Sequence, residues 1–216
     1  MRVLVIGANG NTGRRLTEIL AHGPHHPVAM IRQPAQQEWF QQRGIETVQG
    51  DLEHPIDDAV QDCDAVIFAA GSGPKTGKDK TVLIDHIGAI RSMVAAAIHG
   101  ARRYVMLSSI GASVTSTSPI QHYHRAKGHA DAFLQGMHEV MEHTLDWTIV
   151  RPGRLTDEPG GGAAIFDPGS EKPTTSRQTL AEGLAACLDE PASIGKTFHL
   201  FDGQQSIRDL LRQLDD

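Results

Sequence analysis

A glycine-rich turn after the first apolar run constrains the fold of this chain more than any other feature. The run Val3–Ile6 is typical of a strand that is buried on both faces of a parallel sheet. It ends in three glycines spaced three residues apart, Gly7, Gly10 and Gly13, and apolar residues then recur at helical spacing over Leu16–Leu20. A strand, a glycine turn and a helix in this order favour a dinucleotide-binding unit over an ordinary turn.

The three glycines have different predicted tasks. Gly7 permits the tight turn, Gly10 lets a pyrophosphate approach the backbone, and Gly13 lets the helix pack closely on the strand. The N–H groups at the start of the helix then face the phosphates. The residues between the glycines are further candidate cofactor contacts: Asn9, Asn11 and Thr12.

Composition narrows the class of protein. A chain of 216 residues with 39% hydrophobic residues fits one domain, residues 1–216, and no apolar run approaches the roughly 20 residues of a membrane helix. A core strand at the N-terminus leaves no room for a signal peptide, so a cytoplasmic location is expected. The net charge of -6 argues against a nucleic-acid partner. We expect Cys63 and Cys187 to serve as small apolar residues. The twelve histidines are scattered and are expected at the surface, and no metal site is expected.

Strands and helices are predicted to alternate along the chain, which indicates a Rossmann fold: a doubly wound, mostly parallel sheet of about seven strands. The long helix before residue 100 places Leu83, Ile87 and Met93 at core-facing intervals. Thr156–Thr175 is predicted to be irregular, within a small substrate-side loop region over 154–176. The predicted strands after the first are 27–31, 46–49, 64–71, 103–109, 147–150 and 196–201.

The end of the second strand predicts which cofactor binds. A carboxylate at this position would bind the ribose 2′-hydroxyl of NAD, whereas an arginine accommodates the 2′-phosphate of NADP. The residue here is Arg32, and either Arg14 or Arg15 is a candidate second charge. The sequence therefore favours NADP(H). Asp51, after the third strand, either accepts a hydrogen bond from the adenine amino group or stabilises a turn.

Other candidate cofactor contacts follow later strands. Small residues, which a flat cofactor needs beside the backbone, end the fourth strand. The loop Ser72–Lys80, which contains Lys75, is a candidate lid or substrate edge, with an exposed solvated loop as the alternative. The additional candidates are Leu52, Ala69, Ala70, Gly71, Pro152 and Gly153.

A tyrosine and a lysine four residues apart form the second chemical signal. Tyr123 and Lys127 would share one helix face, where a lysine ammonium favours ionisation of the phenol. The phenol would then act as a proton donor or acceptor. Ser109 ends the preceding strand, at the sheet edge where ligands bind in such folds.

Together these motifs resemble the short-chain dehydrogenase/reductase superfamily, in particular its atypical NAD(P)-binding members that are named as epimerases or oxidoreductases. The resemblance covers nearly the whole chain, including Gly7–Gly13, Gly50–Leu52, Ser108–Ala112 and Thr148–Gly153. It implies that Tyr123 is the catalytic tyrosine, that Lys127 also holds the nicotinamide ribose, and that Ser109 orients the substrate oxygen.

Two departures from the superfamily pattern stand out. Asp85 falls where most members have an asparagine, which weakens an inferred proton relay. The segment around Gly136–His143 is longer than in relatives, so the substrate rim is expected to differ.

Three functions follow from these observations. The first is an NADP(H)-dependent oxidoreductase acting on a small molecule, as a monomer or small homo-oligomer. The second is a non-catalytic NADP-binding redox sensor, resembling nitrogen-regulator-type proteins. The third is a sugar-nucleotide epimerase or dehydratase, although the sixty-odd residues after Gly153 are few for the substrate domain of such enzymes.

Overall fold

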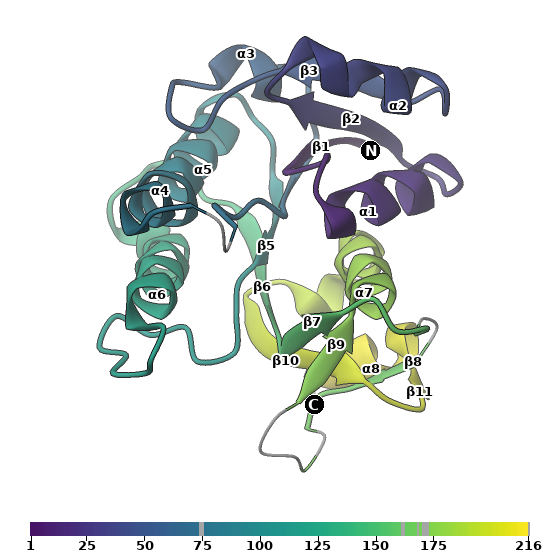
Figure 1. Cartoon of the computed structure of the whole chain (residues 1–216), viewed down its shortest axis with the longest axis vertical. Coiled ribbons are helices and arrows are strands. Elements are labelled where there is room, and N and C mark those ends of the chain that lie inside the picture. The colour runs from purple at the N-terminus through teal and green to yellow at the C-terminus, as the bar shows by residue number, and fades with distance from the viewer. Residues whose placement is uncertain (74–75, 161–162, 168, 170–172, 216) are drawn as a thin grey trace.

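A twisted sheet that contains seven neighbouring parallel strands organises the protein (Figure 1). The computed structural model describes residues 1–73, 76–160, 163–167, 169 and 173–215. The parallel strands, in the spatial order β3-β2-β1-β4-β5-β6-β10, are β1 (Arg2–Ile6), β2 (His26–Ile31), β3 (Glu46–Gln49), β4 (Ala65–Phe68), β5 (Arg103–Leu107), β6 (Asp146–Pro152) and β10 (Lys196–Asp202). Winding reverses between β1 and β4, which opens a crevice at their carboxyl ends. The predicted doubly wound sheet is confirmed.

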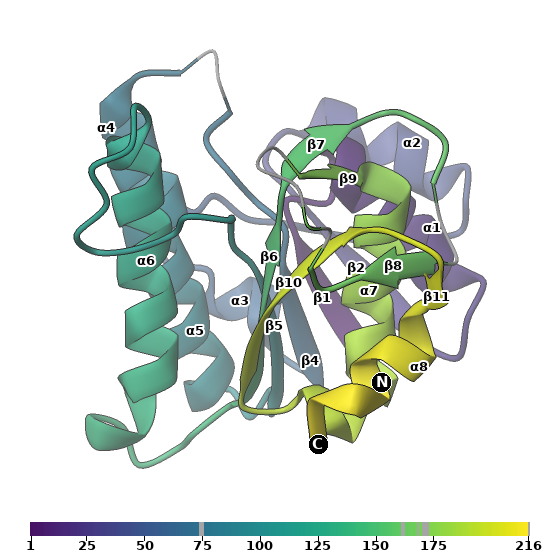
Figure 2. The ribbon, with the colours of Figure 1, turned by 90° about the horizontal axis from the view of Figure 1, so that it is seen from below.

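Helices cover both faces of this sheet (Figure 2). One face carries α1 (Asn11–Ala21), α2 (Gln37–Gln41, after a 3₁₀ turn at Pro34–Gln36), α7 (Arg177–Asp189) and α8 (Ile207–Arg212). The other carries α3 (Asp57–Val60), α4 (Lys78–Thr81), α5 (Ala89–Ile98) and α6 (Gln121–Gly136). Strand β1 sends Val3 and Val5 to the first face and Leu4 and Ile6 to the second, all fully buried. Burial on both faces explains why its apolar run is unbroken.

The segment 156–175 is more regular than its sequence predicts. Strand β7 (Arg154–Thr156) pairs with β9 (Thr174–Ser176), and β8 (Ala163–Ile165) runs antiparallel to β10 and β11 (Gln205–Ser206). The prediction of an irregular segment was wrong because these short strands find partners remote in sequence, which local pattern does not reveal. Of the glycines there, 161 and 162 lie outside the described residues.

Helix α4, a π-helical segment (Val82–Gly88) and α5 form one helix over Lys78–Ile98, so the predicted loop ends earlier than Lys80. Lys75 lies outside the described residues. Ile87, predicted to face the core, is 39% exposed, because a π turn adds a residue and shifts the helix phase. Met93 is buried as expected.

By length and mean hydropathy the helix Lys78–Ile98 is long and apolar enough to span a membrane, although the sequence predicted no such helix. Half of its most apolar window is buried, as in a core helix.

The segment around Gly136–His143 lies at the sheet edge opposite the crevice. It connects the end of α6 to the start of β6, and therefore sits at the amino ends of the strands. The crevice is at the carboxyl ends, so the expectation that these extra residues alter the substrate rim was wrong. Cys63 and Cys187 are buried and unpaired, as predicted for apolar-type cysteines.

Candidate functional site

The glycine turn joins β1 to α1, and its three glycines have different surroundings. Gly7 has a φ of +85°, and a Cβ on it would lie 2.6 Å from the Ala70 nitrogen. A Cβ on Gly13 would lie 2.2 Å from the Gly7 carbonyl oxygen, so packing alone excludes a side chain at both positions. Gly10 is exposed, and a Cβ there would meet only that oxygen, at 3.2 Å. The space beside Gly10 is open to a ligand.

The N-terminus of α1 faces this open space without a side-chain cap. The N-cap residue is Gly10, which has no side chain that could accept a hydrogen bond from the first turn. The N–H groups of Asn11 and Thr12 therefore keep the donor capacity that makes helix N-termini bind anions. A pyrophosphate fits this arrangement.

A cleft of about 540 Å³ lies at the carboxyl ends of β1 to β4. Eight predicted cofactor residues line it: Gly7, Asn9, Gly10, Arg32, Asp51, Leu52, Ala70 and Gly71. Residues that sequence reasoning did not assign to the cofactor complete the wall: Met30, Gln36, Gly50, Glu53, Ser72, Thr76, Lys80 and Ile84. The other predicted contacts lie outside this lining: Asn11, Thr12, Gly13, Ala69, Lys127, Pro152 and Gly153. The size and the small residues of the cleft fit a dinucleotide.

Cationic side chains flank the end of the cleft formed by β2. The Arg32 side chain is exposed, and its guanidinium has no ion-pair partner among the described residues. Arg14 donates a hydrogen bond to Asn9 Oδ1 at 2.7 Å, and Asn9 lines the cleft. Arg15 instead pairs with Asp157 at 3.3 Å. Of the two candidates for a second charge, Arg14 is therefore the better placed.

Asp51 stabilises a turn at the rim of the cleft. Its Oδ1 accepts a hydrogen bond from the Glu53 backbone N–H at 3.1 Å. Glu53 in turn pairs with Lys80 at 2.5 Å, across to α4. The turn role is thus present in the structure, and the contact with adenine stays a prediction.

Ser109, Tyr123 and Lys127 meet where β5 ends against α6. The Lys127 ammonium lies 6.0 Å from the centroid of the Tyr123 ring, on the same face of the helix. The Ser109 hydroxyl lies at the end of β5, where it donates a hydrogen bond to the Ile110 carbonyl oxygen at 3.1 Å and lowers the pKa of the Tyr123 phenol. These three residues therefore lie together, although their catalytic roles stay predictions.

Lys127 is almost completely buried and its ammonium is held from three directions. It donates hydrogen bonds to the carbonyl oxygens of Ala70 and Leu107, each at 3.2 Å, and pairs with Asp85 Oδ1 at 3.2 Å. Asp85, on the π-helical segment, is also buried, and its Oδ2 accepts a hydrogen bond from the Ser72 N–H at 3.0 Å. Lys127 thus joins α6 to the ends of β4 and β5 through hydrogen bonds and to the π-helical segment through a buried ion pair.

The electrostatics of Tyr123 differ from expectation. Burial raises the pKa of its phenol; Lys127 lowers that pKa, as expected, but Asp85 raises it again, and the net pKa lies above 10.0. For Lys127, burial lowers the pKa, but Asp85 and Tyr123 more than compensate, so its pKa is raised and the ammonium stays charged. The predicted effect of Lys127 on the phenol is therefore present, but burial and Asp85 outweigh it.

Sequence reasoning missed a second buried carboxylate beside this site. Asp131 Oδ2 accepts hydrogen bonds from Ser108 Oγ and from an Arg151 guanidinium nitrogen, both at 2.8 Å. Burial raises the Asp131 pKa even though both partners oppose the shift. Asp131 follows Lys127 by four residues, as Lys127 follows Tyr123, and this spacing was the available signal.

Pro152 and Gly153 have packing roles of their own. The Pro152 carbonyl accepts a hydrogen bond from the Ile110 N–H at 2.9 Å, and the Gly153 N–H donates to Thr175 Oγ1 at 3.0 Å. A Cβ on Gly153 would lie 2.2 Å from the Pro173 oxygen. Their proposed contact with the cofactor stays a prediction.

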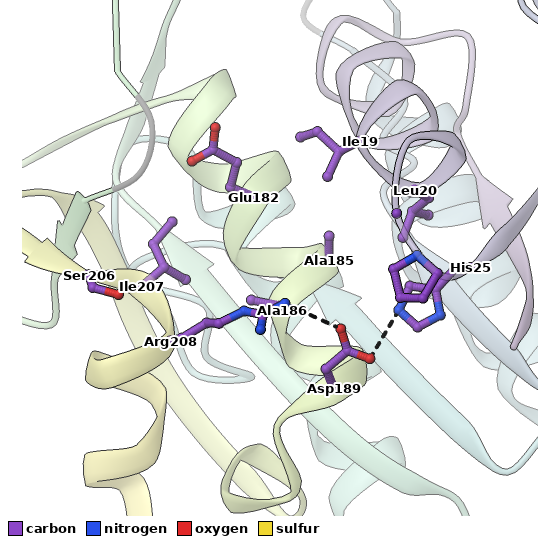
Figure 3. A pocket seen from close by; sticks show the side chains of 12 residues that line it. Ile19, Leu20, His25, Glu182, Ala185, Ala186, Asp189, Ser206, Ile207 and Arg208 are labelled. Atoms are coloured by element: carbon purple, nitrogen blue, oxygen red, sulfur yellow. Dashed lines mark ion pairs between the residues drawn. The ribbon is translucent and has the colours of Figure 1, made fainter.

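A second hollow, of about 300 Å³, lies between α1, α7 and α8 (Figure 3). His25 faces Asp189 there, with Nε2 3.1 Å from Oδ1, and only 6% of the His25 side chain is exposed. The prediction of a surface histidine was wrong for this residue. His25 precedes β2 and lies at the amino ends of the strands, so this hollow is separate from the cleft beside Gly10.

The comparisons agree with this geometry. A family described as NAD(P)H-binding matches residues 7–191. The "Uncharacterized sugar epimerase YhfK" of Bacillus subtilis is 37% identical over 99% of this chain and 100% of its own length. A solved structure from Bacillus halodurans, named "Putative NAD-dependent epimerase/dehydratase", is 39% identical, with a TM-score of 0.89 and 99% of each chain covered. An anaerobillin reductase from Escherichia coli O157:H7 shares the fold, at 22% identity and a TM-score of 0.76, over 94% of this chain and 97% of its own.

Proposed function

The chain belongs to the NAD(P)H-binding family, and on this premise we propose that it is an NADP(H)-dependent oxidoreductase that acts on a small molecule. The observation that carries the proposal is the meeting of Ser109, Tyr123 and Lys127 at the carboxyl edge that also holds the glycine turn. A cytoplasmic location and a monomeric or small homo-oligomeric state remain parts of the proposal.

Each residue of the site has one task in this reaction. Bound NADPH supplies the hydride. The Tyr123 phenol gives its proton to the substrate oxygen, and the Ser109 hydroxyl holds the same oxygen by a hydrogen bond. Lys127 fixes the geometry, because its buried ammonium joins α6 to the ends of β4 and β5. The unpaired guanidinium of Arg32 supports a preference for NADP over NAD.

Sugar epimerisation is the second candidate, because the names of the Bacillus relatives suggest it. An epimerase oxidises and then reduces its substrate, so the cofactor returns to its starting state. Net consumption of NADPH would distinguish the two candidates.

The test is NADPH oxidation against a panel of quinones, aldehydes, ketones and flavins. The Tyr123→Phe variant removes one oxygen and keeps the ring, so turnover should fall about 10²–10⁴-fold while NADPH affinity is unchanged. Tyr104→Phe is the matched control: Tyr104 is the only other tyrosine, is fully buried, and its phenol bonds Ser92 at 2.7 Å. Full activity of Tyr123→Phe would exclude the tyrosine mechanism. Binding of NADPH without turnover of any panel member would favour the sensor.

A further inference from the structure

The buried charges around Tyr123 are unequally spaced. The Lys127 ammonium is 3.2 Å from Asp85 Oδ1 but 6.0 Å from the centroid of the Tyr123 ring. The side chains of Lys127 and Asp85 are 2% and 0% exposed, so solvent does not screen them. Coulomb interactions weaken with distance and strengthen in a low dielectric. The ammonium is therefore held in a close ion pair with the carboxylate, whereas no hydrogen bond joins it to the Tyr123 phenol among the described residues.

Its surroundings hold the Asp85 carboxylate in this position. Its Oδ2 accepts the hydrogen bond from the Ser72 N–H, and a Cβ on Gly71 would lie 3.2 Å from Oδ1. Oδ1 has no hydrogen-bond partner among the described residues, so its ion-pair contact with Lys127 is its main stabilising interaction. Loss of either charge would leave the other buried alone.

We propose that Asp85 neutralises Lys127 and thereby keeps the Tyr123 phenol protonated, which prepares the site to donate a proton to a carbonyl-type substrate rather than to accept one from an alcohol. The proposal rests on the oxidoreductase function proposed above. In the reducing direction the substrate carbon accepts hydride from NADPH, the C=O π bond breaks, and the Tyr123 Oη–H proton moves to the oxygen. The products are an alcohol, NADP⁺ and a phenolate, which regains a proton from water. Asp85 acts through Lys127 and is a positioning residue.

The other groups around the phenol do not remove this effect. Asp131, one helical turn beyond Lys127, adds a second negative charge that also raises the Tyr123 pKa. Ser109 lowers this pKa, and the neighbouring His124 ring lies 5.9 Å from the Tyr123 ring. Asp85 and Asp131 therefore both raise the pKa of the phenol, although the Arg151 guanidinium pairs with Asp131 at 2.8 Å.

The decisive measurement needs neither cofactor nor substrate. NMR of protein labelled at tyrosine Cζ follows the ionisation of each phenol with pH, and only two tyrosines are present. In the wild type, most of the Tyr123 phenol should still be protonated at pH 10.0, which is the ordinary pKa of a tyrosine. Asp85→Asn should lower the Tyr123 pKa by at least about one unit, and Asp131→Asn by less. Tyr104, whose burial raises its pKa, is the internal control, and circular dichroism at each pH checks the fold.

An unchanged Tyr123 pKa in folded Asp85→Asn would overturn the proposal, and so would a wild-type phenol that ionises below pH 10.0. If Asp85→Asn does not fold, Asp85→Ser keeps an oxygen for the Ser72 N–H, and the wild-type titration still decides. In the active enzyme, Asp85→Asn should move the alkaline limit of reductive kcat down by the same number of units, with KM and NADPH affinity within about twofold. A lowered phenol pKa in a protein that reduces nothing would support the role of Asp85 and refute the oxidoreductase function.

Discussion

The two regions of the proposed site are built in different ways: the cleft beside Gly10 is its nucleotide end, and the residues around Tyr123 are its proposed catalytic end. The nucleotide end consists of backbone and exposed side chains: the glycine turn, an uncapped helix N-terminus and the unpaired Arg32. The catalytic end consists of buried charges, Lys127 with Asp85 and Arg151 with Asp131. One end leaves polar groups free for a ligand, whereas the other pairs its charges within the protein. Substitutions at the first should therefore affect binding, and substitutions at the second should affect stability and proton transfer together.

The largest expected effect is a difference between two glycines of one turn when each is replaced by valine. Gly13→Val should prevent folding, because its Cβ would lie 2.2 Å from a carbonyl oxygen of the turn. Gly10→Val should fold and lose cofactor binding, because its side chain enters the open space where the pyrophosphate is expected. Circular dichroism and calorimetric titration with NADPH check both. Full-strength NADPH binding by folded Gly10→Val would show that the nucleotide lies elsewhere.

Lys127→Met should lower the free energy of unfolding by about 3–5 kcal/mol, because it leaves the Asp85 carboxylate buried and unpaired. The double variant Lys127→Met/Asp85→Asn should recover most of this loss. Denaturant unfolding measures both. Equal stability of the two variants would contradict the view that the catalytic end is held by charge pairing.

Arg32→Ala tests the nucleotide end. A charge-assisted contact with the 2′-phosphate contributes about 1.5–3 kcal/mol, so the wild type should bind NADP(H) at least roughly tenfold more tightly than NAD(H), and the variant should lose this preference. Unfolding stability should not change, because the side chain is exposed. Arg14→Ala and Arg15→Ala are the controls for calorimetry with both cofactors. Equal wild-type affinities would refute the NADP assignment.

The smallest expected effect measures how much an exposed ion pair contributes to the free energy of unfolding. The hydrogen bond from Arg2 lowers the pKa of Glu46 to about 2, against an ordinary value of 4.5. A carboxylate with a lowered pKa stabilises the fold above its ordinary pKa, and this contribution disappears as the pH falls from 4.5 to about 2. Because solvent screens the pair, Glu46→Gln should cost less than about 1 kcal/mol at neutral pH. Unfolding at neutral and acidic pH measures it, and a difference that persists below pH 2 would point to packing.

Local patterns predicted the sheet and half of the site. The apolar runs and helical spacing gave the doubly wound sheet, and the spacing of Tyr123 and Lys127 placed both on one helix face. These patterns did not predict short strands such as β8, nor the π turn that exposes Ile87. Both depend on contacts with residues that are remote in the sequence.

The sequence by itself determined the glycine turn, the helix that begins there and the position of Arg32, because a strand–turn–helix unit is set by neighbouring residues. Only the tertiary structure decided that Asp85 pairs with Lys127, and that Asp131 joins Ser108 to Arg151. These partners come from separate elements, and burial, which makes their charges matter, exists only once the sheet and helices have packed.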